Sequence, residues 1–176
     1  MIIGLSGYAG VGKDTVAKYI TEIDSSFKIK KFSGKLKQVA SMLTGIPEKN
    51  FESQDFKNTE LAGWDMTARE LLQKLGTEAI RDCLHKDAWV NALFSDYHQG
   101  ENWIITDVRF PNEYYTIYRW NGINVRLERD GVKPINAHES ETALDEFVFN
   151  YKLVNMGGID RWKTIAEYLL NEINEK

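Results

Sequence analysis

The residues MIIGLSGYAGVGKDT (1–15) determine how the fold begins. The apolar run over 1–6 predicts a buried strand that leads into a loop. After the loop, Val16, Ile20 and Ile23 recur at helical spacing, which predicts a helix with one buried face. The stretch therefore predicts a strand, a glycine-rich loop and a helix in succession.

The loop from Gly7 to Thr15 has the composition of a phosphate-binding loop. Glycines let backbone N–H groups curl around phosphate oxygens. A helix N-terminus favours the anion, and a lysine neutralises the charge of the β- and γ-phosphates. The residues expected at the phosphates are Gly10, Val11, Gly12, Lys13, Asp14 and Thr15.

Asp14 stands where a serine or threonine normally contacts Mg²⁺ in such loops. An aspartate there can bind Mg²⁺ directly or through water, because hard cations accept carboxylate oxygen. The carboxylate also brings a negative charge close to the phosphates. We expect Thr15, the next residue, to donate to the α-phosphate.

A second motif, Asp107-Val-Arg-Phe-Pro-Asn-Glu113, follows the apolar strand predicted at 103–106. Asp107 would lie at the carboxyl edge of the sheet, where α/β folds bind their ligands, and can hold hydrated Mg²⁺. Arg109 can bridge donor and acceptor phosphates with its two-pronged guanidinium. The alternative is that Arg109 and Glu113 form a structural ion pair at a helix start.

A third motif lies on the helix predicted to begin at Thr67, where Thr67-Ala-Arg-Glu70 matches a capping box. Arg69, Gln73 and Gly76 share one stripe at helical spacing. A guanidinium can bind phosphate, an amide can contact a base edge, and a glycine lets a ligand approach closely. By itself such a stripe is more typical of a solvated helix face, and its position beside a phosphate-binding loop and an aspartate-ended strand is what favours substrate binding. A distinct, apolar face of the same helix comprises Leu71, Leu72, Leu75 and Ala79.

Strands and helices alternate along the rest of the chain, which predicts an α/β fold with a mostly parallel sheet. Further strands are expected at 27–33, 103–106, 124–128 and 151–154, and further helices at 34–43, 67–84, 88–97, 112–120 and 162–173. The segment 45–65 predicts loops and at most one short helix, and 129–142 predicts a polar flap. No composition shift divides the 176 residues, so a single domain is expected.

Composition and net charge exclude several classes of binding partner. The chain is 43% hydrophobic and 27% charged with a net charge of −4, so it has no basic surface for duplex nucleic acid or an anionic membrane. No apolar run is long enough to span a bilayer, and no signal-peptide pattern begins the sequence. The single cysteine, Cys83, excludes an intrachain disulfide and lies in an apolar-periodic stretch, so we expect it to be buried. These features are typical of a soluble, cytoplasmic protein.

Three segments together resemble the phage deoxynucleoside monophosphate kinases: GYAGVGKDTVA, TARELLQKLGTEAIRD with the following DAWV, and ITDVRFPNE. The segments occur in the order of that family and spread over most of the chain. DVRFPNE is the most specific of them and GKDT the next. The segment 45–65 and the C-terminal third carry least of the resemblance.

The resemblance implies a three-layer P-loop nucleoside monophosphate kinase-like fold with an acceptor-binding helical region (about 34–98) and a lid (about 129–142). It implies transfer of the γ-phosphoryl group of ATP, with Mg²⁺, to the 5′-phosphate of a deoxynucleoside monophosphate (dNMP). Only small-molecule partners are implied, in a monomer or a homodimer.

The resemblance also implies roles for individual residues. Lys13, Asp107, Arg109 and a lid arginine would be catalytic, and Asp14 and Asp107 would hold Mg²⁺. The acceptor site would include Lys37, Arg69, Gln73, Gly76, Trp89, Arg109 and Glu113. Trp89 would stack on the base or, equally, belong to the core. Lys37 would contact the acceptor phosphate or, equally, lie on the surface.

The segment Arg126-Leu-Glu-Arg129-Asp-Gly-Val, which leads into the lid and resembles that region of the family, contains two arginines. Positive charge at the transferred group and exclusion of water both favour phosphoryl transfer, and a closing loop can supply them. Strand alternation places Arg126 and Glu128 on one face and Arg129 beyond the strand end, which favours Arg129 as the catalytic arginine. His138 is expected to be a loop histidine without a catalytic role.

Two other classes of function fit parts of this pattern. One is a P-loop kinase of another small molecule, such as dephospho-coenzyme A, phosphomevalonate or a sugar acid. Arg69, Gln73 and Trp89 favour an acceptor with a base over these. The other is a binding module that uses ATP as a switch without transferring phosphate.

Overall fold

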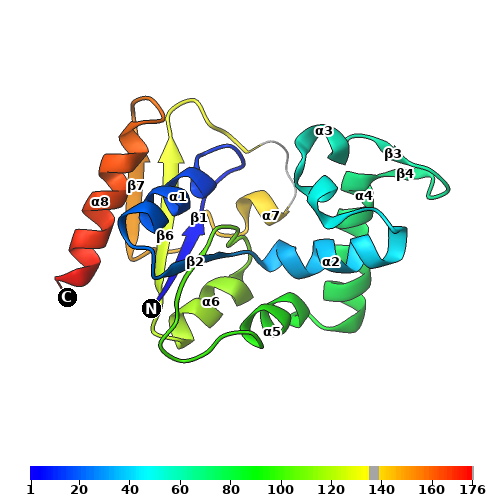
Figure 1. Cartoon of the computed structure of the whole chain (residues 1–176), viewed down its shortest axis with the longest axis horizontal. Helices are drawn as coiled ribbons and strands as arrows, with labels where there is room; N and C mark the ends of the chain where they lie inside the picture. Colours follow the sequence, from blue (N-terminus) through cyan, green and yellow to red (C-terminus); the bar gives the residue numbers. More distant parts are fainter. Residues whose placement is uncertain (135–138, 176) are drawn as a thin grey trace. The chain divides into compact units, whose positions relative to one another are not determined.

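The computed structural model describes residues 1–134 and 139–175, and its residues form two compact units (Figure 1). Unit 1 combines Met1–Lys31 with Tyr97–Lys176, and unit 2 is Phe32–Asp96. Unit 2 covers nearly the same residues as the predicted acceptor-binding region, 34–98. That function stays a prediction.

Unit 1 contains a five-stranded sheet in which every neighbouring pair of strands is parallel. The strand order is β2-β5-β1-β6-β7. The strands are β1 (Ile2–Ser6), β2 (Phe27–Lys30), β5 (Asn102–Ile105), β6 (Ile123–Arg129) and β7 (Tyr151–Asn155). The predicted α/β class with a parallel sheet is confirmed, and the arrangement is consistent with the P-loop kinase-like fold.

Helices cover both faces of this sheet, which makes three layers. On one face, α1 (Lys13–Ile23) and α8 (Arg161–Asn174) pack together against the strands. On the other, α6 (Pro111–Arg119) packs on β1 and β6. A Cβ at Gly4 of β1 would lie 2.5 Å from Cδ1 of Ile117 in α6, so this close approach requires glycine.

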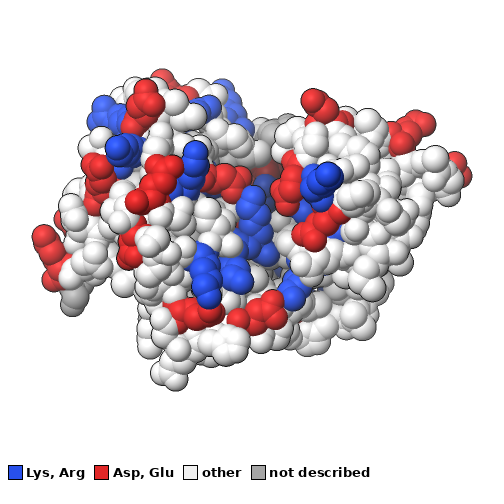
Figure 2. Space-filling view, viewed as in Figure 1, with Lys and Arg blue, Asp and Glu red and all other residues white. Residues whose placement is uncertain are grey.

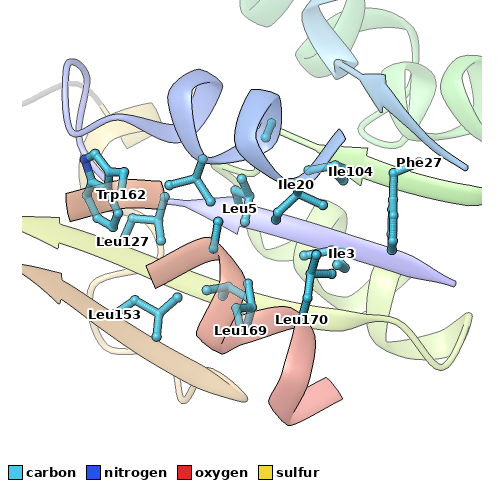
Figure 3. Packing of buried hydrophobic residues seen from close by; sticks show 14 of the residues in the cluster. Ile3, Leu5, Ile20, Phe27, Ile104, Leu127, Leu153, Trp162, Leu169 and Leu170 are labelled. Atoms are coloured by element: carbon cyan, nitrogen blue, oxygen red, sulfur yellow. The ribbon is translucent and has the colours of Figure 1, made fainter. Parts of the chain in front are cut away.

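The main core lies between the sheet and the α1/α8 layer (Figure 3). Because side chains alternate along β1, Ile3 and Leu5 point into this layer, where they meet Ile20 of α1 and Trp162 of α8. Burying an aliphatic or aromatic side chain of this size contributes about 1.5–3 kcal/mol. The buried members are Ile3, Leu5, Val11, Val16, Ala17, Ile20, Phe27, Ile104, Val125, Leu127, Leu153, Trp162, Ala166, Leu169, Leu170 and Ile173.

Unit 2 is mostly helical and has its own core of Ala40, Phe51, Leu61, Ala68 and Leu71. Its elements are α2 (Phe32–Thr44), the 3₁₀ turn η1 (Glu48–Glu52), α3 (Gln54–Lys57), β3 (Glu60–Leu61), β4 (Met66–Thr67), α4 (Ala68–Gln73), η2 (Lys74–Leu84) and α5 (Ala88–Phe94). The segment predicted as loops with one short helix contains η1 and α3, and its strand β3 pairs antiparallel with β4. That two-stranded sheet was not predicted.

The helix that starts at Ala68 differs from the prediction in its second half. The capping box is present, with Glu70 N donating to Thr67 Oγ1 at 3.2 Å and Thr67 N donating to Glu70 Oε2 at 2.7 Å. From Lys74 to Leu84, however, the turns are π-helical, and His85 N donates to Ile80 O at 2.9 Å, five residues back.

The wider turns change which side chains are buried. Cys83, predicted to be buried, is exposed, and so is Ala79 of the predicted apolar face. Both expectations assume constant α-helical spacing, which ends at Gln73. Ile23, predicted on the buried face of the first helix, is also exposed, and it is the last residue of α1.

Two element boundaries also differ. The strand predicted to reach Ser33 ends at Lys30, and α2 begins at Phe32. β6 continues to Arg129, so Arg129 is the last residue of the strand and does not lie beyond it. A short helix, α7 (Glu139–Thr142), lies in the predicted flap, and residues 135–138 of the flap, including His138, lie outside the described residues.

Basic and acidic side chains lie interspersed on the face shown in Figure 2.

Within the described part of the chain, no helix has both the length and the apolar character needed to cross a bilayer.

Candidate active site

The loop from Gly7 to Gly12 connects β1 to α1, as predicted. Gly7 has a φ of 141°, and a Cβ there would lie 2.4 Å from the carbonyl oxygen of Leu127. Gly12 has a φ of 115°, and a Cβ there would lie 2.5 Å from Nε1 of Trp162. Both glycines are therefore required by backbone conformation and by the residues packed against the loop.

Lys13 is the first residue of α1, and its ammonium lies inside the loop. Nζ donates to the carbonyl oxygens of Gly7 and Tyr8 at 2.6 and 2.9 Å. The residue as a whole is only 9% exposed. Burial, followed by repulsion from Arg109, lowers the pKa of Lys13 to about 8. Burial is the larger of the two causes, and the charges of Glu141, Asp14 and Asp107 act in the opposite direction and raise the pKa.

Asp14 lies in the first turn of α1 with contacts to two other elements. Its Oδ1 accepts from Oγ1 of Thr106 at 2.9 Å and lies 3.0 Å from Nζ of Lys31. Burial raises the pKa of Asp14, but the bond from Lys31 and its charge outweigh burial and bring the pKa below its usual value. Asp14 is therefore ionised at neutral pH. Thr15 follows it in the same turn.

Asp107, Arg109 and Glu113 follow β5, and each has a different environment. Asp107 is close enough to Lys13 for the charge of its carboxylate to raise the pKa of the lysine. Arg109 NH1 donates to Oε1 of Glu141 at 2.6 Å. Glu113 is buried, and its Oε2 accepts from the backbone N–H groups of Arg109 and Phe110 at 2.8 and 3.0 Å. Glu113 therefore stabilises the start of α6.

Of the two candidate lid arginines, Arg126 has contacts at the glycine loop between β1 and α1. Its guanidinium is buried, with NH1 3.3 Å from Ser6 Oγ and its central carbon 4.9 Å from the centre of the Tyr8 ring. NH2 donates to Oδ1 of Asp145 at 2.6 Å. Arg129, which alternation favoured, is half-buried at the end of β6. Its catalytic role stays a prediction.

The predicted acceptor residues all lie in unit 2, apart from Arg109 and Glu113. Arg69 is exposed and donates to Asn58 Oδ1 and Gln54 Oε1 at 3.2 and 3.3 Å. Gln73 is also exposed. Lys37 is not a surface lysine, because it is 5% exposed and pairs with Glu52 at 2.6 Å.

Gly76 and Trp89 have contacts inside unit 2. A Cβ at Gly76 would lie 2.9 Å from Cδ2 of Leu36, so the close approach at this glycine is made by another helix of the unit. Trp89 is 7% exposed, and its Nε1 donates to the carbonyl oxygen of Gly76 at 2.8 Å. These contacts favour the core alternative for Trp89 over base stacking.

The sequence predictions missed two acidic residues of this region, Glu141 and Asp145. Glu141 Oε2 accepts from the backbone N–H of Ala9 at 3.2 Å. Asp145 Oδ2 accepts from the hydroxyl of Tyr8 at 2.9 Å. The available signal was their spacing of four residues in an otherwise polar segment, which is too common to indicate a site by itself.

The residues present are suitable for Mg²⁺ bound mainly through phosphate. Within residues 1–134 and 139–175, no three His, Cys, Asp or Glu side chains form a group that could hold a metal ion. Mg²⁺ commonly uses one or two carboxylates and completes its shell with substrate phosphates and water. Asp14 and Asp107 both act on Lys13 through their charges, so two carboxylates lie near the loop.

A viral protein resembles this chain over nearly its full length. No protein-family model matches the chain. A protein of Acanthamoeba polyphaga mimivirus named "Putative deoxynucleotide monophosphate kinase" is 29% identical to it over 185 residues. The alignment covers 96% of this chain and 92% of that protein, so the likeness extends over both units.

Proposed function

We propose that this protein is a deoxynucleoside monophosphate kinase that transfers the γ-phosphoryl group of ATP to the 5′-phosphate of a dNMP, giving ADP and a dNDP. The observation that carries the proposal is the buried Lys13 ammonium inside the glycine loop, with the Arg109 charge close enough to lower its pKa. The full-length likeness to the mimivirus protein supports the phosphate acceptor.

In this proposal, the loop N–H groups and Lys13 bind the β- and γ-phosphates. Phosphoryl transfer passes through a state with charge spread over the equatorial oxygens, so fixed positive groups stabilise it. Arg109 and a lid arginine add to this charge. Bound Mg²⁺, held near Asp14 and Asp107, would supply charge neutralisation at the phosphates.

No general base is needed for this reaction, since a phosphate monoester is already ionised near pH 7. Positioning of the two substrates then supplies most of the rate enhancement. We assign contacts with the dNMP to Arg69 and Gln73, the exposed members of the predicted set. Arg69 would bind an anionic group and Gln73 a base edge.

The test is Mg-ATP turnover measured as ADP release, with dAMP, dGMP, dCMP and dTMP as separate acceptors. AMP, dephospho-coenzyme A and a reaction without acceptor are the comparisons. Stimulation by at least one deoxynucleotide is the expected result. Stimulation by dephospho-coenzyme A alone would contradict the acceptor assignment, and ADP release that no acceptor stimulates would favour the ATP-switch alternative.

A further inference from the structure

Two carboxylates of the segment 139–145 connect the phosphate loop to the arginines of unit 1. Glu141, in α7, accepts from Ala9 N at 3.2 Å through Oε2 and from Arg109 NH1 at 2.6 Å through Oε1. Asp145 bridges the Tyr8 hydroxyl, at 2.9 Å, and Arg126 NH2, at 2.6 Å. Each carboxylate therefore joins one group of the loop to one arginine.

Glu141 is the more deeply placed of the two. Its side chain is 8% exposed, whereas that of Asp145 is 29% exposed. A buried carboxylate needs charged and N–H partners to offset the loss of hydration. Those partners are a loop N–H and a guanidinium, and the charge of Glu141 also acts on Lys13. The same types of group bind phosphate oxygens in proteins.

We propose that Glu141 is an internal competitor for phosphate. Its carboxylate takes the place, between Ala9 N–H and the Arg109 guanidinium, that a phosphate oxygen of the nucleotide takes on binding. The Ala9 N–H cannot donate fully to the Glu141 carboxylate and to a phosphate oxygen at the same time. A carboxylate and a phosphate that both contact this N–H would also repel each other strongly. Nucleotide binding therefore displaces the carboxylate, and the same event frees Arg109 to contact phosphate.

This inference rests on the proposed function in one respect, the binding of phosphate at residues 7–15. Competition by Glu141 lowers the affinity of the loop for phosphate, because phosphate can bind only when the contacts of Glu141 with Ala9 and Arg109 are broken. Removing the charge of Glu141 should thus strengthen phosphate binding. A residue that only positions Arg109 would have the opposite effect when changed.

The experiment measures binding of inorganic tripolyphosphate by isothermal titration in metal-free buffer. It compares the wild type with Glu141→Gln and with Glu139→Gln, an exposed residue of the same short helix that provides the same change in net charge. Glu141→Gln should bind about tenfold more tightly than Glu139→Gln, a coupling of ordinary size between competing groups. Equal or weaker binding by Glu141→Gln would overturn the inference.

Two further measurements separate the possible failures. Without tripolyphosphate, Glu141→Gln should have a lower melting temperature than the wild type, and it should gain more stability on saturation. A purely structural residue would lower both temperatures equally, which would overturn the inference. If Glu141→Gln does not fold, Glu141→Asp, which shortens the side chain by one methylene, should give a smaller gain in affinity, and no gain would count against the inference.

The outcome is distinguishable from a failure of the kinase proposal. If tripolyphosphate binds none of the proteins, both the phosphate site and the competition are wrong. If the expected affinities are found but no dNMP stimulates ADP release, the kinase proposal alone fails.

Discussion

The glycine loop between β1 and α1 and the helix α4 are both predicted from short motifs, yet their polar side chains have different environments. At the loop, Lys13 and Arg126 are buried and bonded to neighbouring groups of unit 1. On α4, Arg69 and Gln73 are exposed, whereas Gly76, the third member of the predicted stripe, lies in η2 and packs against Leu36. One region is a fixed cluster of charges, and the other is a solvated surface with a packed end.

The difference shows which kind of sequence motif predicts the local structure correctly. The loop motif places glycines where the backbone has a positive φ and where neighbouring atoms leave no room for a Cβ, as at Gly7 and Gly12. The helical stripe depends on a constant turn width, which changes at Lys74. We therefore expect large effects from changes at the loop and smaller effects from changes in unit 2.

The largest effect is expected for Lys13→Ala. The change removes the ammonium that neutralises the transferred phosphate, so ADP release stimulated by dNMP should fall by about 10³-fold. Far-ultraviolet circular dichroism should stay unchanged. The matched control is Lys18→Ala, on the exposed face of the same helix. Near-full activity in Lys13→Ala would show that the loop is not the reactive centre.

Arg109→Ala should reduce turnover by about 10²-fold, because Arg109 contributes positive charge close to Lys13. The control is Arg119→Ala, in the last turn of α6, which should keep wild-type kinetics. If the two variants have equal turnover, Arg109 serves only its ion pair with Glu141, and the loop contains fewer functional charges than the comparison assumes.

The pH dependence of ATP binding tests whether the Lys13 ammonium binds ATP and has a lowered pKa. Because the pKa of Lys13 is lowered to about 8, the ammonium loses its proton as the pH rises above that value. The dissociation constant of ATP in metal-free buffer should then rise by up to about tenfold per pH unit. ATP itself is fully ionised at this pH. Lys13→Ala should show a flat profile, and a flat profile in the wild type would contradict the assignment.

Arg69→Ala should raise the Michaelis constant for the dNMP by about tenfold and that for ATP much less, since a charge-assisted hydrogen bond to the acceptor is lost. Lys74→Ala, an exposed residue at the start of η2, is the control. Steady-state kinetics with each substrate varied in turn give both constants. Equal changes for the two substrates would mean that α4 is only a solvated surface.

The smallest effect is expected for Trp89→Phe. The change removes the indole donor to Gly76, so the free energy of unfolding should fall by about 1 kcal/mol. Both Michaelis constants should stay unchanged. Denaturant titration measures the first quantity, with Trp120→Phe, an exposed residue, as the control. A raised Michaelis constant for the dNMP without loss of stability would restore base stacking as the role of Trp89.

Much of the fold followed from local patterns. The apolar run at β1, the capping box at Thr67 and the strand before Asp107 each depend on neighbouring residues, and the structure contains all three. Parallel pairing followed from the alternation of strands and helices. The predictions failed where local spacing changed, as at Cys83, or where an element extended further than its pattern, as at Arg129.

The sequence by itself determined the α/β class, the position of the glycine-rich loop and the lysine at its end, because apolar runs, glycine content and helix starts are local properties of the sequence. Only the tertiary structure decided that Glu141 and Asp145 reach the loop, across 132 and 137 residues of chain. It also decided that Arg126 lies at Tyr8 and that Trp89 packs on Gly76. Contacts of this kind depend on how the strands are ordered in the sheet and how the helices pack, which no local pattern encodes.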